Sequence, residues 1–223
     1  MPPRDLHRED ARERLLTTAL SLFANLGYTN TSTRALAEAA QVNVAAISYY
    51  FGDKAGLYRA VFFEPAGSCG GDLAMLRDPA LALHDVLHQY YASFVDPLRS
   101  GEVARLGMKL RMREMLEPTG LWQEEITAEI RPAHDALAHS LAGRMGCAVD
   151  DDVHRLAICI TALGVHLHVA HDVIDALAPQ VQQGDVAYSR WIEVLVRNAV
   201  AMVHAEAARR GGAADGASAE ERG

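Results

Sequence analysis

Apolar residues recur at helical spacing along most of the chain, and no stretch alternates in the manner of a β-strand. The first such pattern predicts a helix over Arg8–Leu26, which Gly27 ends in the usual C-terminal position. Its expected core side consists of Leu15, Leu16, Ala19, Leu22, Phe23 and Leu26. Hydroxyls at Thr31–Thr33 can cap a second helix, and Asn43 can cap a third. The pattern therefore predicts an all-α fold that opens with three short helices.

The second and third predicted helices are joined by a tight turn, which is the arrangement of a helix-turn-helix. Their shared apolar seam consists of Leu36, Ala37, Ala40, Val42, Ile47 and Phe51. The third helix starts with Val44, Ala45 and Ala46, and polar tips follow at Ser48, Tyr49 and Tyr50. Small residues suit a helix that enters a DNA major groove about 12 Å wide. The alternative is an ordinary helical pair inside a core, and exposure of the two tyrosines argues against it.

Further helices are expected beyond this segment. Asp53 is placed to cap a helix that ends near Phe63, and the Pro- and Gly-rich segment 64–71 then marks a hinge between a head and a body. Asp78-Pro79 predicts a helix that begins at the proline and ends near Arg99. The next helices are expected over 102–116 and 119–145, and Pro132 should kink or split the second of them.

The two last predicted helices are unusually apolar. The first follows the acidic run 150–152 and reaches about Leu177, and the second covers 185–208. Apolar residues cover more than one face of each, so we expect a partner on both sides, one being the chain's own core and the other a second subunit. The expected dimer interface consists of Leu163, Leu167, Ile192, Leu195 and Ala199. The expected division is a head over 1–54, a body over 55–210 and a disordered tail over 211–223.

Charge is divided unevenly along the chain. The net charge is -8, yet residues 1–54 hold six basic and six acidic side chains, so the excess acid lies beyond Lys54. An acidic body is repelled by a duplex, which helps to orient a neutral head toward it.

Other function classes find little support. The three cysteines at 69, 147 and 159 form no CxxC spacing and no even framework, so a reducing cytoplasm is the expected compartment. The longest apolar run, 156–170, is shorter than the roughly 20 residues that span a bilayer. No nucleophile elbow, P-loop or HExxH motif occurs, so we expect neither an enzyme nor a bound cofactor or metal.

Residues 11–58 resemble the N-terminal domain of the tetracycline-repressor (TetR) family of bacterial transcription regulators. The resemblance rests on GYTNTSTRALAEAA followed by VNVAAISYYFGDKAGLY, in the family's order and spacing. Farther along, RMREMLEP and EIRPAHDALA are similar to the CecR-like subgroup. The family implies a homodimer with a four-helix interface, and a ligand pocket whose occupancy changes the separation of the two heads.

The resemblance also implies roles for individual residues on double-stranded operator DNA. Thr33, Tyr50 and Lys54 would contact phosphates, and Arg34 a base or phosphate. The groove-reading set would be Val44, Ala45, Ala46, Ser48 and Tyr49. Two departures stand out, because Gln41 replaces a frequent glycine and Val44 a frequent lysine. A two-fold dimer would require a palindromic site whose halves lie near one helical turn, about 34 Å, apart.

A small-molecule effector is expected to bind the body. The candidate lining consists of Tyr90, Met108, Arg111, Met112, Met115, Trp122 and His166, because methionine and aromatic side chains make adaptable walls. Core packing explains most of them equally well. For Arg111, Arg113 and Glu114, a ligand contact and an ordinary salt bridge are equally plausible. His166, His168 and His171 favour pocket or core positions over a metal site, since only His168 and His171 share a helix face.

Together these features predict a DNA-binding regulator, most simply a repressor that a small apolar or amphipathic molecule releases from its operator. The alternatives are an enzyme that uses the histidines and an architectural DNA-binding protein without a ligand.

Overall fold

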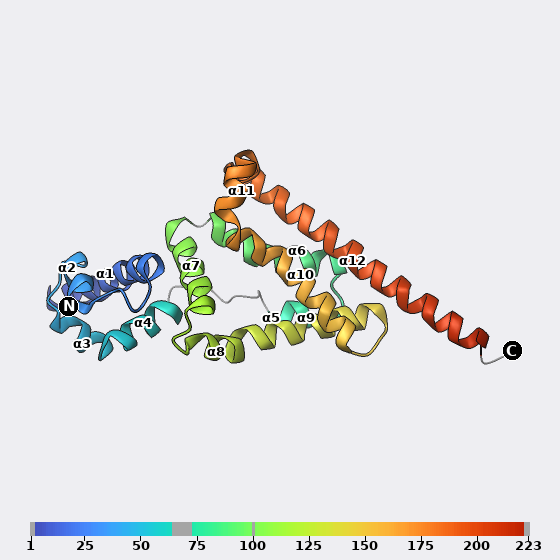
Figure 1. Cartoon of the computed structure of the whole chain (residues 1–223), viewed down its shortest axis with the longest axis horizontal. Helices are drawn as coiled ribbons and strands as arrows, with labels where there is room; N and C mark the ends of the chain where they lie inside the picture. The colour runs from blue at the N-terminus through green and yellow to red at the C-terminus, as the bar shows by residue number, and fades with distance from the viewer. Residues whose placement is uncertain (1–2, 64–72, 100, 221–223) are drawn as a thin grey trace. The chain divides into compact units, whose positions relative to one another are not determined.

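The computed structural model describes residues 3–63, 73–99 and 101–220, and the side chains of 11–63, 73–99 and 101–211. Every regular element in these ranges is a helix, as predicted (Figure 1). The chain forms two compact units: residues 1–68 with 100–126, and residues 69–99 with 127–223. The predicted hinge over 64–71 lies outside the described residues.

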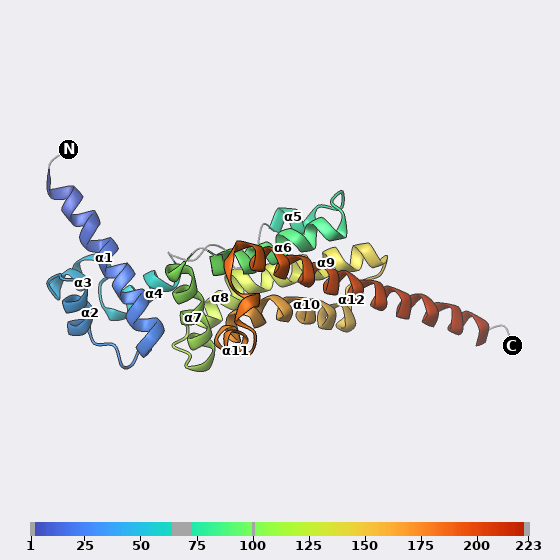
Figure 2. The same ribbon diagram turned by 90° about the horizontal axis from the view of Figure 1, so that it is seen from above.

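The first unit contains six helices among its described residues. They are α1 (Pro3–Leu26), α2 (Thr33–Ala39), α3 (Ala45–Phe51), α4 (Lys54–Phe63), α7 (Glu102–Leu116) and α8 (Leu121–Glu125). In Figure 2, α1 is seen against α2, α3 and α4, which it contacts. Helix α7 packs against α1 and α4, so this unit extends well beyond the head expected over 1–54.

The core of the first unit is built from the apolar seams of these helices. Its fully covered members include Leu15, Ala19, Phe23, Leu36, Ile47, Leu57, Val61 and Leu110. Leu26 is 47% exposed, so its expected place on the core side of α1 is wrong. Leu26 is the last residue of α1, and Gly27 follows it with a φ of +83°. The chain therefore turns away from the helix next to Leu26, which leaves this side chain at the surface.

The second unit combines four long α-helices with two short ones among its described residues. They are α5 (Leu73–Arg77), α6 (Leu83–Arg99), α9 (Arg131–Met145), α10 (Asp151–Val169), α11 (His171–Leu177) and α12 (Gly184–Glu220). Helix α6 contacts both α10 and α12, and Figure 2 shows α9 and α10 side by side. A Cβ at Gly164 would lie 2.9 Å from Phe94 Cγ, so glycine lets α6 approach α10 closely.

Prolines 79 and 132 have different outcomes. At Pro132 the helical run is not interrupted as a split would require; it changes to a π-helical stretch, Ile126–Ile130, just before α9 begins at Arg131. The helix expected from Pro79 is wrong, because α6 begins only at Leu83. Asp78 Oδ1 accepts a hydrogen bond from Ala80 N at 2.8 Å, and this local turn replaces the first helical turn.

The last two predicted helices also differ from expectation. The helix expected to reach Leu177 breaks at Ala170, and α11 bends away from α10 by 72°. Gln182 Nε2 donates to His171 O at 2.9 Å and stabilises the start of α11. Helix α12 continues to Glu220, past the expected end near residue 208 and through most of the tail expected to be disordered.

No single described helix has both the length and the apolar character needed to cross a membrane. Only the bent pair α10 and α11 reaches that length and apolar content when taken together, as the core helices of many proteins do.

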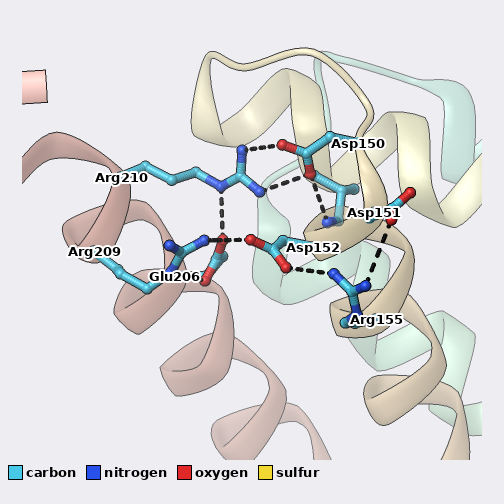
Figure 3. A network of polar contacts seen from close by, with 8 residues as sticks. Asp150, Asp151, Asp152, Arg155, Glu206, Arg209 and Arg210 are labelled. Atoms are coloured by element: carbon cyan, nitrogen blue, oxygen red, sulfur yellow. Dashed lines mark hydrogen bonds and ion pairs between the residues drawn. The ribbon is translucent and has the colours of Figure 1, made fainter. Parts of the chain in front are cut away.

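An ion-pair network joins α12 to the start of α10 (Figure 3). Asp150 caps α10 by accepting from Val153 N at 3.0 Å, and Arg210 donates to its carboxylate at 2.8 Å. Glu206 accepts from Arg209 and Arg210, each at 2.7 Å. These hydrogen bonds hold the pKa of Asp150 well below its usual range and lower the pKa of Glu206 to about 2.

Candidate nucleic-acid interface and effector region

The turn between α2 and α3 is shaped by side-chain caps that the sequence predicts. Ser32 Oγ accepts from Ala35 N at 3.1 Å, and Asn43 Oδ1 accepts from Ala45 N at 2.9 Å. Gln41 adopts φ +55°, the left-handed conformation that glycine takes without cost, and this strain is worth about 1 kcal/mol. The two caps and the turn at Gln41 fix where α2 and α3 begin and how the chain passes from one helix to the other.

Helix α3 turns one side to the core and leaves the other open. Ile47 is 1% exposed, whereas Tyr49 is 63% and Val44 45% exposed. Ala45 and Ser48 are also exposed, so the predicted groove-reading side lies at the surface. Tyr50 and Ala46 are half-buried, and the Tyr50 ring packs edge-on against Tyr49 with 4.9 Å between centroids.

The basic candidates lie on α2 and α4, the two helices that precede and follow α3 and contact it within the same unit. Arg34 is exposed at the start of α2, and Thr33 beside it is half-buried. Lys54 begins α4, and its Nζ lies 4.2 Å from the centroid of the Tyr28 ring. Partial burial lowers the pKa of Lys54. Tyr28 is a residue that sequence reasoning missed, since nothing in the spacing of GYT indicates a contact with a lysine 26 positions later.

The charged residues of α7 have partners inside the first unit. Arg111 Nε donates to Glu125 Oε1 at 3.1 Å, and both side chains are buried. Arg113 pairs with Glu117 at 3.1 Å and donates to Asn25 O at 3.2 Å. The salt bridges that the sequence left open as an alternative are therefore present, and a ligand contact by Arg111 stays a prediction.

Glu114 links α7 to α4 and to the start of α8. Its carboxylate accepts from the Tyr58 hydroxyl at 2.8 Å and from the backbone N of Thr119 at 2.7 Å. Burial, followed by the hydrogen bond to Glu114, raises the pKa of Tyr58 far above its usual value. Glu114 is fully buried with these two partners, so its carboxylate joins the helices of the unit and is not exposed to solvent.

The seven candidate effector contacts are divided between the two units. Met108, Arg111, Met112, Met115 and Trp122 lie on α7 and α8 of the first unit, whereas Tyr90 and His166 lie on α6 and α10 of the second. Met115 is 48% exposed and His166 is also exposed. The Tyr90 hydroxyl bonds Thr161 Oγ1 at 2.7 Å, and burial raises the pKa of Tyr90 to about 12.

Three histidines of the second unit, His134, His154 and His168, have hydrogen-bond partners within that unit. His168 Nε2 donates to Phe94 O at 2.7 Å, and burial lowers the pKa of its imidazole. His134 Nε2 and His154 Nδ1 are 2.9 Å apart, a pairing of α9 with α10 that sequence reasoning did not single out. Among the described residues, no three His, Cys, Asp or Glu side chains are grouped as metal ligands.

The expected dimer residues lie mainly inside one chain. Leu167, Ile192, Leu195 and Ala199 are at most 5% exposed and belong to the core of the second unit, while Leu163 is half-buried. A dimer contact by these residues therefore stays a prediction. The exposed apolar side chains of α10 and α11 are instead Ile158, Val169, Val173 and Leu177.

Comparison with known proteins identifies the family. Residues 15–61 match the family "Bacterial regulatory proteins, tetR family", and residues 83–205, more than half of the chain, match the C-terminal domain of the HTH-type transcriptional dual regulator CecR. The chain belongs to the TetR family, with a CecR-type C-terminal domain. Members of this family are transcriptional regulators, not enzymes.

Individual relatives agree with this assignment. Over 161 residues, 67% of this chain and 71% of the relative, the TetR-family chain is 29% identical to the HTH-type transcriptional dual regulator CecR of Shigella flexneri. It is 46% identical over 53 residues, 24% of this chain and 26% of the relative, to the probable HTH-type transcriptional regulator YttP of Bacillus subtilis (strain 168).

Solved structures with low sequence identity share the fold. A tetR-family regulatory protein from Rhodococcus RHA1 matches with a TM-score of 0.62 and 20% identity, covering 84% of this chain and 95% of that chain. A TetR regulator from Agrobacterium tumefaciens matches with a TM-score of 0.58 and 24% identity, covering 88% and 98%. The described helices therefore follow the fold of TetR-like regulators.

Proposed function

We propose that this TetR-family regulator is a repressor that occupies a palindromic operator and leaves it when a small molecule binds. The observation that carries the proposal is the open side of α3, where Val44, Ala45, Ser48 and Tyr49 are exposed. Methyl groups on that side suit thymine methyls in the major groove, and Arg34 nearby can donate two hydrogen bonds to guanine. Lys54 and Thr33 supply contacts to the flanking phosphates.

A homodimer supplies the two-fold symmetry that a palindrome requires. Two copies of α3 would read half-sites about 34 Å apart, so one chain alone holds only half of the contacts. The exposed apolar side chains of α10 and α11 support a partner that covers them in the dimer.

Release by an effector is a shift between two states of the dimer. The effector must bind more tightly to the state whose heads do not match the operator, because equal affinity for both states changes nothing. Half-buried Met108, Met112 and Trp122 on α7 and α8 support a small apolar or amphipathic molecule as this effector.

The test begins with selection of bound fragments from random duplexes, which reports both operator and symmetry. Arg34→Ala should then weaken binding to the selected operator by about 1–3 kcal/mol, because a bidentate contact to guanine is lost. Affinity is measured by fluorescence anisotropy, with thermal unfolding to show that the fold is intact.

Arg77→Ala is the matched control, because Arg77 is an exposed arginine of the second unit. It should bind the operator as the wild type does. Equal affinity of Arg34→Ala and the wild type would remove Arg34 from the interface. A selection that yields no sequence preference would favour an architectural protein instead.

A further inference from the structure

Glu125 at the end of α8 holds a buried oxygen without a hydrogen-bond donor. The residue is 1% exposed, and its Oε1 accepts from Arg111 Nε at 3.1 Å. Its second oxygen, Oε2, has no hydrogen-bond partner among the described residues. In this part of the chain it is the one buried side-chain oxygen or nitrogen that lacks a partner. Leaving a carboxylate oxygen buried and unpaired is costly, so the position calls for an explanation.

Arg111 does not satisfy this carboxylate as arginine usually does. An arginine commonly grips a carboxylate with two parallel hydrogen bonds. Here Nη2 is directed instead to Phe62 O at 3.4 Å, and the guanidinium lies 5.3 Å from the centroid of the Phe62 ring. Because Arg111 directs Nη2 to the backbone of α4, it bonds only Oε1 of Glu125, and Oε2 can still accept a hydrogen bond.

Apolar side chains accompany this acceptor at helical spacing. Leu121 and Trp122 precede Glu125 by four and three positions on α8, so they share its face, and both are half-buried. Met108 precedes Arg111 by three positions on α7 and is also half-buried. An acceptor with such neighbours suits a molecule that has a donor at one end and an apolar body.

We propose that Glu125 is the polar anchor of the effector site, and that the effector is an organic cation with N–H donors, such as a protonated amine carried on an apolar body. The inference rests on the proposed function, because it names the chemical class of the effector. A protonated amine donates to Oε2 in a charge-assisted hydrogen bond, which is stronger than a bond from a neutral donor. A carboxylate ligand would be repelled by the same oxygen.

The contacts of Arg111 also explain how occupancy would reach the DNA-binding helices. A cation at Oε2 shares the Glu125 carboxylate with Arg111 at Oε1 and so weakens the attraction of that carboxylate for Arg111, which contacts Phe62 near the end of α4. Helix α4 begins with Lys54, a proposed phosphate contact. Binding at Glu125 therefore acts directly on the packing of α7 against a helix of the DNA-binding surface.

The test uses the full chain and three probes with the same ten-carbon tail, below their micelle concentrations. Decylammonium carries a charge and N–H donors, decyltrimethylammonium carries the charge alone, and decanoate carries the opposite charge. Isothermal titration calorimetry should show decylammonium binding at least ten-fold more tightly than either of the others. Glu125→Gln should weaken decylammonium binding at least ten-fold, whereas Glu102→Gln, at an exposed position of α7, should not.

Several outcomes would overturn the proposal. These are absence of decylammonium binding, equal binding by Glu125→Gln, or preference for decanoate. If Glu125→Gln does not fold, the order of the three probes on the wild-type chain still decides, since it needs no variant. Operator binding without probe is measured in parallel: a wild type that binds its operator but not decylammonium refutes only this inference, whereas one without an operator refutes the proposed function.

Discussion

At the scale of single residues, the position of Lys54 depends on an aromatic ring. Tyr28 lies beneath the ammonium and also packs against Tyr58, with 4.9 Å between ring centroids. A cation held over a ring loses less freedom when it reaches a phosphate. Tyr28 is thus a positioning residue that touches no DNA in the proposed complex.

Tyr28→Leu should weaken operator binding by about 0.5–1 kcal/mol, the usual worth of such a cation–ring contact. Tyr28→Phe keeps the ring and should bind as the wild type does. Both affinities are measured over a series of salt concentrations, with thermal unfolding to correct for any loss of stability. Equal weakening by both variants would assign the effect to the hydroxyl and contradict a role for the ring.

Residue types predict some site features and not others. Asn43 and Ser32 cap their helices as expected, because a capping side chain bonds a donor only two or three positions away. The pairing of Arg111 with Glu125 spans two helices, and the sequence offered several equally charged alternatives. Local hydrogen bonds are therefore predictable from sequence, whereas the partners of long side chains are decided by packing.

At the scale of elements, α10 carries a histidine that makes stability depend on pH. Burial lowers the pKa of His168 and the nearby His171 on α11 lowers it further, while the hydrogen bond from its Nε2 to Phe94 O acts in the opposite direction. The pKa of His168 is therefore lower in the folded chain than its ordinary value of 6.5. The unfolded chain binds this proton more readily, so the stabilisation is present above about pH 6.5 and is lost as the pH falls.

We expect the free energy of unfolding to decline as the pH falls from about 7 to about 5. His168→Gln keeps a donor for Phe94 O but does not titrate in this range, so the decline should become shallower. Urea unfolding at several pH values measures the effect. His88→Gln, at an exposed position of α6, is the control and should keep the wild-type slope. Identical slopes for all three proteins would contradict this account.

Helix boundaries show where periodicity is a sufficient guide. The change to π geometry falls just before Pro132, where the sequence predicts a disturbed helix because a proline removes a backbone donor wherever the chain goes. The break at Ala170 carries no proline or glycine, and it is accompanied by the Gln182 contact from the next turn. Where α12 continues past residue 208, Arg210 joins it to Asp150, and no local sequence pattern near residue 208 predicts that contact (Figure 3).

At the scale of the whole molecule, apolar patterning identifies covered faces but not what covers them. Ile192, Leu195 and Ala199 are predicted from the sequence to contact a second subunit, and in the structure the core of their own chain covers them. The same ambiguity affects the boundary at residue 54, since α7 joins the first unit through contacts with α1 and α4. The helix-turn-helix escapes this ambiguity, because its function lies on a side that must stay open.

The exposed apolar residues of α10 and α11 give the dimer a different test from the buried ones. Ile158 and Val169 are three helical turns apart on one face of α10 and are 58% and 62% exposed. Val169→Glu should dissociate the proposed dimer and leave the helices folded, because the new charge stays hydrated in a monomer but is buried in a dimer. Leu195→Glu should instead unfold the chain, since Leu195 is 3% exposed in its own core.

Sedimentation equilibrium with circular dichroism separates these results, and Leu116→Glu, at an 84% exposed position of the first unit, is the control. A Val169→Glu protein that sediments as a dimer would place the interface elsewhere, whereas a folded monomer should also lose its preference for palindromic over half-site DNA.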